Sequence, residues 1–356
     1  MITPSDATLA QFALAAYSSA PSLPAGFAAA PLAPAPVAGA TYDAGTGLFL
    51  SGNAAALAAT GLLDGRQTLV LAFCGSDDRE DSLNDLRNIN ADYADLQPQV
   101  AAADAYAASG AVEQVVVAGH SLGGALTQVF MAEHPDVPGG VTYRGQTFGS
   151  PGALLPPAAD ARIENVVVAD DPVPALGAHR GEIGALLRAD PALAAVAARR
   201  AAEEFPGLTE QDALDSLPFL TANHVNRGTL VLLPAEDGRL DLASPSGLLE
   251  VDLSRHAPTL YAEATAAAAA GTLAQRQVPV APAGAEDAAY RAVYAGDYPG
   301  SLDVSGLVED VAEAWARRDG LLDDAQAWLD RAGGGGPIAA DWGGALDWAR
   351  GELDLF

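Results

Sequence analysis

The residues with the clearest chemical potential lie in one short stretch, Gly119-His120-Ser121-Leu122-Gly123, which fits the pattern G-x-S-x-G. A serine at the centre of this pattern sits on a tight turn between a strand and a helix, and the flanking glycines let the two elements approach each other. Such a turn exposes the serine hydroxyl and aims the next backbone N–H at the atom under attack. The stretch predicts a nucleophile at Ser121 and an oxyanion donor at Leu122. The alternative is an ordinary strand-to-helix loop.

A serine nucleophile needs a base within hydrogen-bonding distance and a carboxylate that orients the base. In α/β hydrolases the three groups follow the chain order serine, acid, histidine, each beyond the end of a strand. The stretch "VVVADDPVPALG" offers Asp170 and Asp171 in such a place. Asp171 precedes a proline and is the better candidate for the acid. The alternative for it is a turn or helix-capping aspartate.

Five histidines are candidates for the base. Three stand in unsuitable places, because they fill the serine motif, lie on the helix after it, or follow the acid too closely: His120, His134 and His179. The base should lie on the loop after the final strand. This position favours His256, in "DLSRHAPTLY", with His224 as the alternative.

A second oxyanion donor should come from the loop that follows the previous strand, the one before the strand that leads to Ser121. That loop begins "AFCGSDD". Gly75 allows the backbone to approach closely, and Ser76 can present both an amide and a hydroxyl. We therefore expect Ser76 to complete the oxyanion hole with Leu122.

Apolar runs and helical stretches alternate around these residues. Strands are predicted at "GLFLSG", "TLVLAF", "VEQVVVAG", "YRGQTFG" and "ENVVVAD", and a hairpin is predicted around Asp237–Gly238. Helices are expected over 6–18, capped by Ser5 or Asp6, and within the acidic stretch 79–109. The alternation predicts an α/β fold with a mainly parallel central sheet and helices on both faces.

Two segments depart from this alternation. Residues 181–222 are helical and interrupted by three prolines, which predicts two or three short helices inserted over one end of the sheet. Residues 276–356 read as a helical C-terminal extension, with an amphipathic helix at 321–331. All four tryptophans lie there, and subdomain packing is favoured over an interface-binding belt. The hydrolase domain is accordingly predicted to span 1–275.

The composition limits the partners and the compartment. The 18 basic residues are all arginine, and they face 46 acidic residues, for a net charge of −28. This charge argues against nucleic acid and against attraction to anionic membranes. It fits solubility in high salt or secretion into a calcium-rich medium. One cysteine allows no intrachain disulfide. The absence of a convincing signal peptide or membrane-spanning run predicts a cytoplasmic location or export by a non-classical route.

Taken together, these stretches resemble the class 3 lipase family over residues 45–265. "LVLAFCGSDD" is similar to the oxyanion segment of the family, "VVVAGHSLGGAL" to its serine corner, "NVVVADDPVPALG" to its aspartate loop and "DLSRHAPTLY" to its histidine segment. The resemblance implies an α/β-hydrolase fold and hydrolysis of carboxylic esters without a metal or organic cofactor. It also implies the roles of five residues, with Ser121, Asp171 and His256 as triad and Ser76 and Leu122 as oxyanion donors. His224 then matches a histidine that is not the base.

Departures from the family leave the substrate open. Cys74 stands where the family often has arginine, the insertion is larger than expected, and the C-terminal extension has no counterpart. A lipid or small-molecule ester is expected as substrate, through lipase or esterase activity. Phospholipase, polyester hydrolase or acyltransferase activity with the same triad, and a non-catalytic lipid-binding scaffold, are the alternatives. The sequence contains no pattern that predicts an oligomeric state.

Two features of the loop after the oxyanion segment have alternative readings. Asp81 and Asp85 share one face if that stretch is helical, which allows a calcium site. A solvated acidic face is the preferred interpretation. The same stretch and the 181–222 insertion are rival candidates for a lid over the site.

Overall fold

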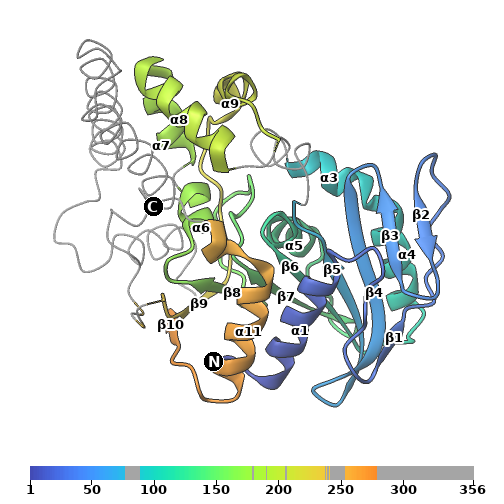
Figure 1. The fold of residues 1–356 in the computed structure, drawn as a ribbon. Coiled ribbons are helices and arrows are strands. Elements are labelled where there is room, and N and C mark those ends of the chain that lie inside the picture. Colours follow the sequence, from blue (N-terminus) through green and yellow to red (C-terminus); the bar gives the residue numbers. More distant parts are fainter. Residues whose placement is uncertain are drawn as a thin grey trace, which may run out of the picture.

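The computed structural model describes residues 1–76, 89–178, 180–189, 191–204, 207–236, 238, 240 and 253–278. In these residues one ten-stranded sheet has the order β10-β9-β8-β7-β6-β5-β4-β3-β2, with β1 paired to β4 (Figure 1). Its strands are β1 (Phe27–Ala29), β2 (Thr41–Asp43), β3 (Leu48–Ser51), β4 (Ala54–Leu63), β5 (Arg66–Phe73), β6 (Gln114–His120), β7 (Thr142–Phe148), β8 (Ile163–Val168), β9 (Thr229–Leu233) and β10 (Arg276–Val278).

The sheet has a parallel centre and antiparallel edges. Strands β5 to β9 run parallel, whereas β1 to β4 and β10 pair antiparallel to their neighbours. The parallel centre agrees with the sequence prediction. The sheet is more mixed than predicted, because the strands from β2 to β5 join through short turns rather than helices. Asp64 and Gly65 make one such turn, with φ of 53° and 75°, values typical of a tight hairpin.

Helices cover both faces of the sheet (Figure 1). α1 (Pro4–Ala15) and α11 (Pro258–Ala269) pack on one face, and α3 (Ile89–Asp95), α4 (Gln97–Ala108) and α5 (Leu122–Glu133) on the other. The β6 side chains alternate between the two cores: Val115 and Val117 join the α3–α5 side, and Val116 and Ala118 the α1–α11 side. Strands buried on both faces explain the uninterrupted apolar runs of the sequence.

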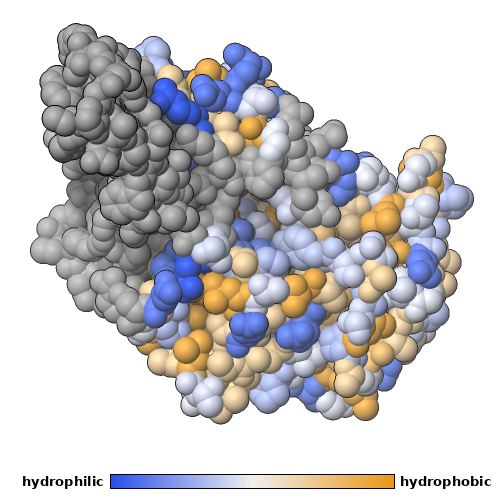
Figure 2. All heavy atoms as spheres, in the orientation of Figure 1, coloured by the Kyte–Doolittle hydropathy of each residue, from blue (hydrophilic) through white to orange (hydrophobic). Residues whose placement is uncertain are grey.

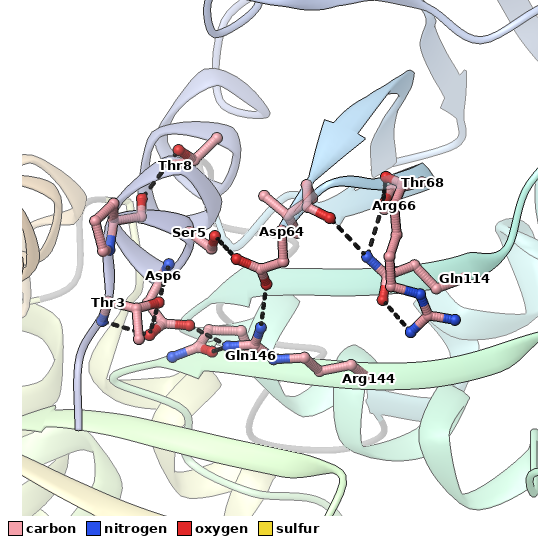
Figure 3. A network of polar contacts seen from close by, with 12 residues as sticks. Thr3, Ser5, Asp6, Thr8, Asp64, Arg66, Thr68, Gln114, Arg144 and Gln146 are labelled. Carbon is pink, nitrogen blue, oxygen red and sulfur yellow. Dashed lines mark hydrogen bonds and ion pairs between the residues drawn. The ribbon is translucent and has the colours of Figure 1, made fainter.

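The N-terminal helix begins earlier than predicted. Thr3, not Ser5 or Asp6, is the N-cap, and Asp6 completes a capping box three residues later. Pro4 fixes this start, because proline suits the first helical position. The buried Asp6 also forms an ion pair with the partly exposed Arg144 of β7, and Ser5 hydrogen-bonds Asp64 (Figure 3). These contacts tie α1 to the amino ends of the parallel strands, the edge opposite the candidate site.

The predicted insertion forms a small helical unit. It contains α7 (Arg180–Ala189), α8 (Pro191–Glu204), α9 (Glu210–Ser216) and the 3-10 turn η1 (Leu217–Phe219), and it follows α6 (Pro172–Ala178). Its apolar residues form two small clusters apart from the main cores. Arg188 Nη1 donates to the carbonyls of Leu217 (2.8 Å) and Leu220 (2.9 Å), which holds the first helix of the unit to its last turn.

Several predicted features lie wholly or largely outside the described residues: the second strand of the Asp237–Gly238 hairpin, the start of the acidic stretch 79–109, the helix at 321–331 and the four tryptophans. The sheet passes the predicted domain boundary at 275, because β10 pairs with β9. Within the described part of the chain, no helix has the length and apolarity needed to span a membrane.

Candidate active site

Ser121 occupies a strained corner between β6 and α5. Its φ of 57° and ψ of −127° lie in a region that residues with a side chain rarely adopt. Among the described non-glycine residues, only Asp64 shares a positive φ. Strain of this kind persists only where the surroundings hold it, and it concentrates at functional sites.

The two glycines of the serine motif are required by close backbone contacts. A Cβ on Gly119 would lie 2.0 Å from the Gly123 carbonyl oxygen, and a Cβ on Gly123 would lie 2.2 Å from the Phe73 carbonyl oxygen. The corner therefore closes tightly and packs directly against the end of β5. This is the arrangement that the sequence pattern predicts.

The two predicted oxyanion donors lie next to the contact between Gly123 and the end of β5: Leu122 precedes Gly123, and Ser76 follows β5. Leu122 is the first residue of α5, where a helix supplies no carbonyl partner for the amide and carries partial positive charge. Ser76 follows β5 and is half-buried. A Cβ on the preceding Gly75 would lie 2.6 Å from the His120 carbonyl oxygen, so this loop runs against the serine corner.

The predicted acid and base are hydrogen-bonded to each other. His256 Nδ1 lies 2.7 Å from Asp171 Oδ2, and the Asp171 side chain is fully buried. The other carboxylate oxygen accepts the Val173 N–H at 2.9 Å. Tyr261 donates its hydroxyl to Asp171 Oδ2 and accepts the Val168 N–H at 3.1 Å. The carboxylate is thus fixed from three directions at the end of β8.

The acid–base pair adjoins the serine corner through Phe148 and Gly149. The Ser121 N–H donates to the Phe148 carbonyl at 3.0 Å. A Cβ on Gly149 would lie 2.7 Å from Asp171 Oδ2 and 3.0 Å from His256 Cε1. In the described structure, His256 Nε2 is buried and makes no hydrogen bond, so the predicted hydrogen bond between Ser121 Oγ and His256 is not formed. The structure therefore joins the predicted acid to the predicted base and brings both next to the serine corner.

His120 packs between this site and the N-terminal helix. Its ring lies 4.6 Å from the His256 ring, centroid to centroid, and its Nδ1 lies 2.8 Å from the Tyr17 hydroxyl. Burial, with a smaller contribution from the neighbouring His256, holds the pKa of His120 well below its usual value. His120 is therefore a neutral packing partner of the candidate base.

The remaining sequence candidates have other partners. His224 is buried, and desolvation and the nearby Arg180 lower its pKa to about 3. Asp170 pairs with Arg255 rather than with a histidine. His134 contacts Asp104 and the Phe130 carbonyl. Desolvation lowers its pKa, but the hydrogen bonds to Asp104 and Phe130 and the nearby carboxylates together outweigh this effect, so the pKa is raised. Asp81, Asp85 and His179 lie outside the described residues. In the part of the chain that the structure does describe, no cluster of His, Cys, Asp or Glu could hold a metal ion.

Several residues at the site were not assigned a role from the sequence. Tyr261 and Arg255 stand in the quoted histidine segment, but no local pattern shows that they reach the loop after β8. A buried amide network is a further case: Gln128 Nε2 donates to Asn165 Oδ1 at 2.7 Å, and Asn165 Nδ2 donates to the Arg227 carbonyl at 2.8 Å. It joins α5, β8 and the residues before β9, and so fixes the helix that follows Ser121.

In comparisons with known proteins, no family model and no curated sequence matches this chain.

Proposed function

We propose that this protein is a serine hydrolase that cleaves carboxylic esters on an α/β-hydrolase fold. The observation that carries the proposal is the strained Ser121 corner beside a buried, hydrogen-bonded Asp171–His256 pair. The chain order serine, acid, histidine and the positions after β6, β8 and β9 support the fold assignment.

In the proposed reaction, Ser121 Oγ attacks the ester carbonyl while His256 Nε2 takes its proton. The tetrahedral oxyanion accepts hydrogen bonds from the Leu122 and Ser76 amides. His256 returns the proton to the leaving alcohol, and an acyl-enzyme remains on Ser121. Water then attacks the acyl group by the reverse transfer and releases the acid. Asp171 keeps the imidazole oriented and stabilises its protonated form.

The charge of the protein favours uncharged substrates. A net charge of −28 repels anionic lipid surfaces and carboxylate-bearing ligands. Figure 2 shows hydrophobic residues interspersed with hydrophilic ones on the face that carries α1 and α11. We therefore favour neutral acyl esters, including acylglycerols.

The proposal is tested with p-nitrophenyl esters from acetate to palmitate, at low and high salt and with and without calcium. Ser121→Ala should reduce hydrolysis at least about 10³-fold and abolish labelling by a fluorophosphonate. Ser109→Ala, at an exposed position after α4, is the control and should keep both. The acyl-chain optimum separates esterase from lipase activity. Absence of both hydrolysis and labelling in the wild-type protein would contradict the proposal.

A further inference from the structure

The residues that precede the candidate acid and base also bind each other. Asp170 and Arg255 form a two-point ion pair, with Arg255 Nε 2.8 Å from Asp170 Oδ2 and Nη2 3.0 Å from Oδ1. Two consecutive residues of the loop after β8 therefore hold two consecutive residues of η2 (Leu253–His256), through Asp170–Arg255 and Asp171–His256. We call the Asp170–Arg255 pair the clasp.

The clasp is partly buried and has a third attachment. The side chains of Asp170 and Arg255 are 20% and 17% exposed, and Asp170 Oδ2 also accepts the Glu236 N–H at 3.0 Å. Asp170 thus joins three segments, namely the loops after β8 and β9 and the turn that carries His256. A planar guanidinium bound at two points fixes both distance and orientation, unlike a single charge contact.

The turn that carries His256 needs such a fixation. β9 ends at Leu233 and η2 begins at Leu253, so His256 does not directly follow a described strand. The Nδ1 hydrogen bond and the contact with the His120 ring hold the imidazole, but neither holds the backbone of the turn that carries it. A second attachment, at the adjacent residue Arg255, holds the backbone of the turn as well as the ring. Placement matters here, because a shift of about 1 Å at a reacting group can lower a rate about 10²-fold.

We propose that Asp170 and Arg255 are positioning residues for His256, which hold the turn of the base against the loop of the acid. This inference rests on the proposed hydrolase function. The competing explanation is an ion pair that stabilises the fold without affecting the reaction.

The test compares Asp170→Asn with Asp160→Asn. Asp160 forms a similar two-point pair with Arg162, at 2.8 and 2.6 Å and with 13% and 22% exposure, just before the amino end of β8 and away from the site. We expect Asp170→Asn to lower kcat about 10- to 100-fold with KM changed less than about twofold. Asp160→Asn should leave kcat within about twofold at a comparable loss in Tm. Arg255→Lys, which keeps the charge but not the fork, should give an intermediate kcat.

A second readout does not depend on hydrolysis. The Nδ1 proton of His256, held by Asp171, should give a far-downfield proton NMR resonance that exchanges slowly with water. Asp170→Asn should broaden that resonance and speed its exchange in folded protein, and Asp160→Asn should not. An unchanged kcat and an unchanged resonance in Asp170→Asn would overturn the inference. If the wild-type protein hydrolyses no ester, the proposed function fails, and the resonance alone decides whether the clasp positions His256.

Discussion

Gly149→Ala should displace the side chains of Asp171 and His256, because the backbone of Gly149 lies directly against them. Gly149 has φ of +59°, and an added Cβ would lie 2.7 Å from Asp171 Oδ2, 2.9 Å from the Tyr261 hydroxyl and 3.0 Å from His256 Cε1. Ordinary contacts with carbon begin at about 3.5 Å, so the carboxylate and the imidazole must retreat by roughly 0.5–1 Å. A displacement of this size should lower kcat about 10- to 100-fold.

The same substitution should also destabilise the fold. A side chain in the left-handed region costs about 1–2 kcal/mol, and overpacking adds about 1–3 kcal/mol. Gly139→Ala is the matched control, because Gly139 has φ of +77° and nothing within 4 Å of an added Cβ. The control therefore carries the backbone strain alone and should lose about 1–2 kcal/mol without loss of activity.

The assay pairs ester hydrolysis with urea unfolding for both variants. We expect the Gly149→Ala and Gly139→Ala variants to differ far more in kcat than in their free energy of unfolding. If Gly149→Ala hydrolysed esters within about twofold of Gly139→Ala, the contact between Gly149 and the acid–base pair would not control the reaction. Such a result would refute a dependence of hydrolysis on the placement of Asp171 and His256.

Two further predictions concern stability and pH. Burial and the neighbouring Asp6 carboxylate raise the pKa of Glu164, so ionisation of Glu164 destabilises the native state as pH rises above the pKa of the unfolded chain. Glu164→Gln should therefore have a higher Tm than wild type at pH 8, and the two Tm values should become equal near pH 4. Equal Tm values at pH 8 would contradict this. The pKa of His224 is lowered to about 3, so this histidine stays neutral in the native state, whereas in the unfolded chain it takes up a proton below about pH 6.5. From this one site, the free energy of unfolding should therefore fall by about 1.4 kcal/mol per pH unit as pH drops towards 3. His224→Gln should reduce that slope by one proton in denaturant titrations, and an unchanged slope would show that His224 titrates normally.

The parts of the site that could be predicted from the sequence are those with a local signature. Ser121 stands between an apolar run and two glycines, and the steric demands of that corner fix the residues around it. Asp171 and His256 could be chosen because each follows the end of a strand. The parallel order of β5 to β9 follows from apolar runs separated by helical segments.

The remaining contacts could not be predicted because they join residues far apart in the chain. Nothing near Tyr261 indicates that its hydroxyl reaches Asp171, or that Arg255 reaches Asp170. Of the antiparallel strands before β5, only β3 was predicted, and β1 and β2 are only three residues long. Thr3 took the cap position because Pro4 fixes the first helical residue, a preference that outweighs the serine and aspartate that follow.

The pairing of α1 with α11 bears on how this protein is made. The Ile2 N–H donates to Gln275 Oε1 at 2.6 Å, and the two helices share one core with Tyr261 at its centre. During translation α1 emerges first, and it must wait for α11 before that core can close. The residues of the serine corner are synthesised well before this moment, but the candidate base and Tyr261 follow only with η2 and α11. A nascent chain on the ribosome thus contains the candidate nucleophile before its candidate base, and under the proposed function it would become reactive only as this core closes.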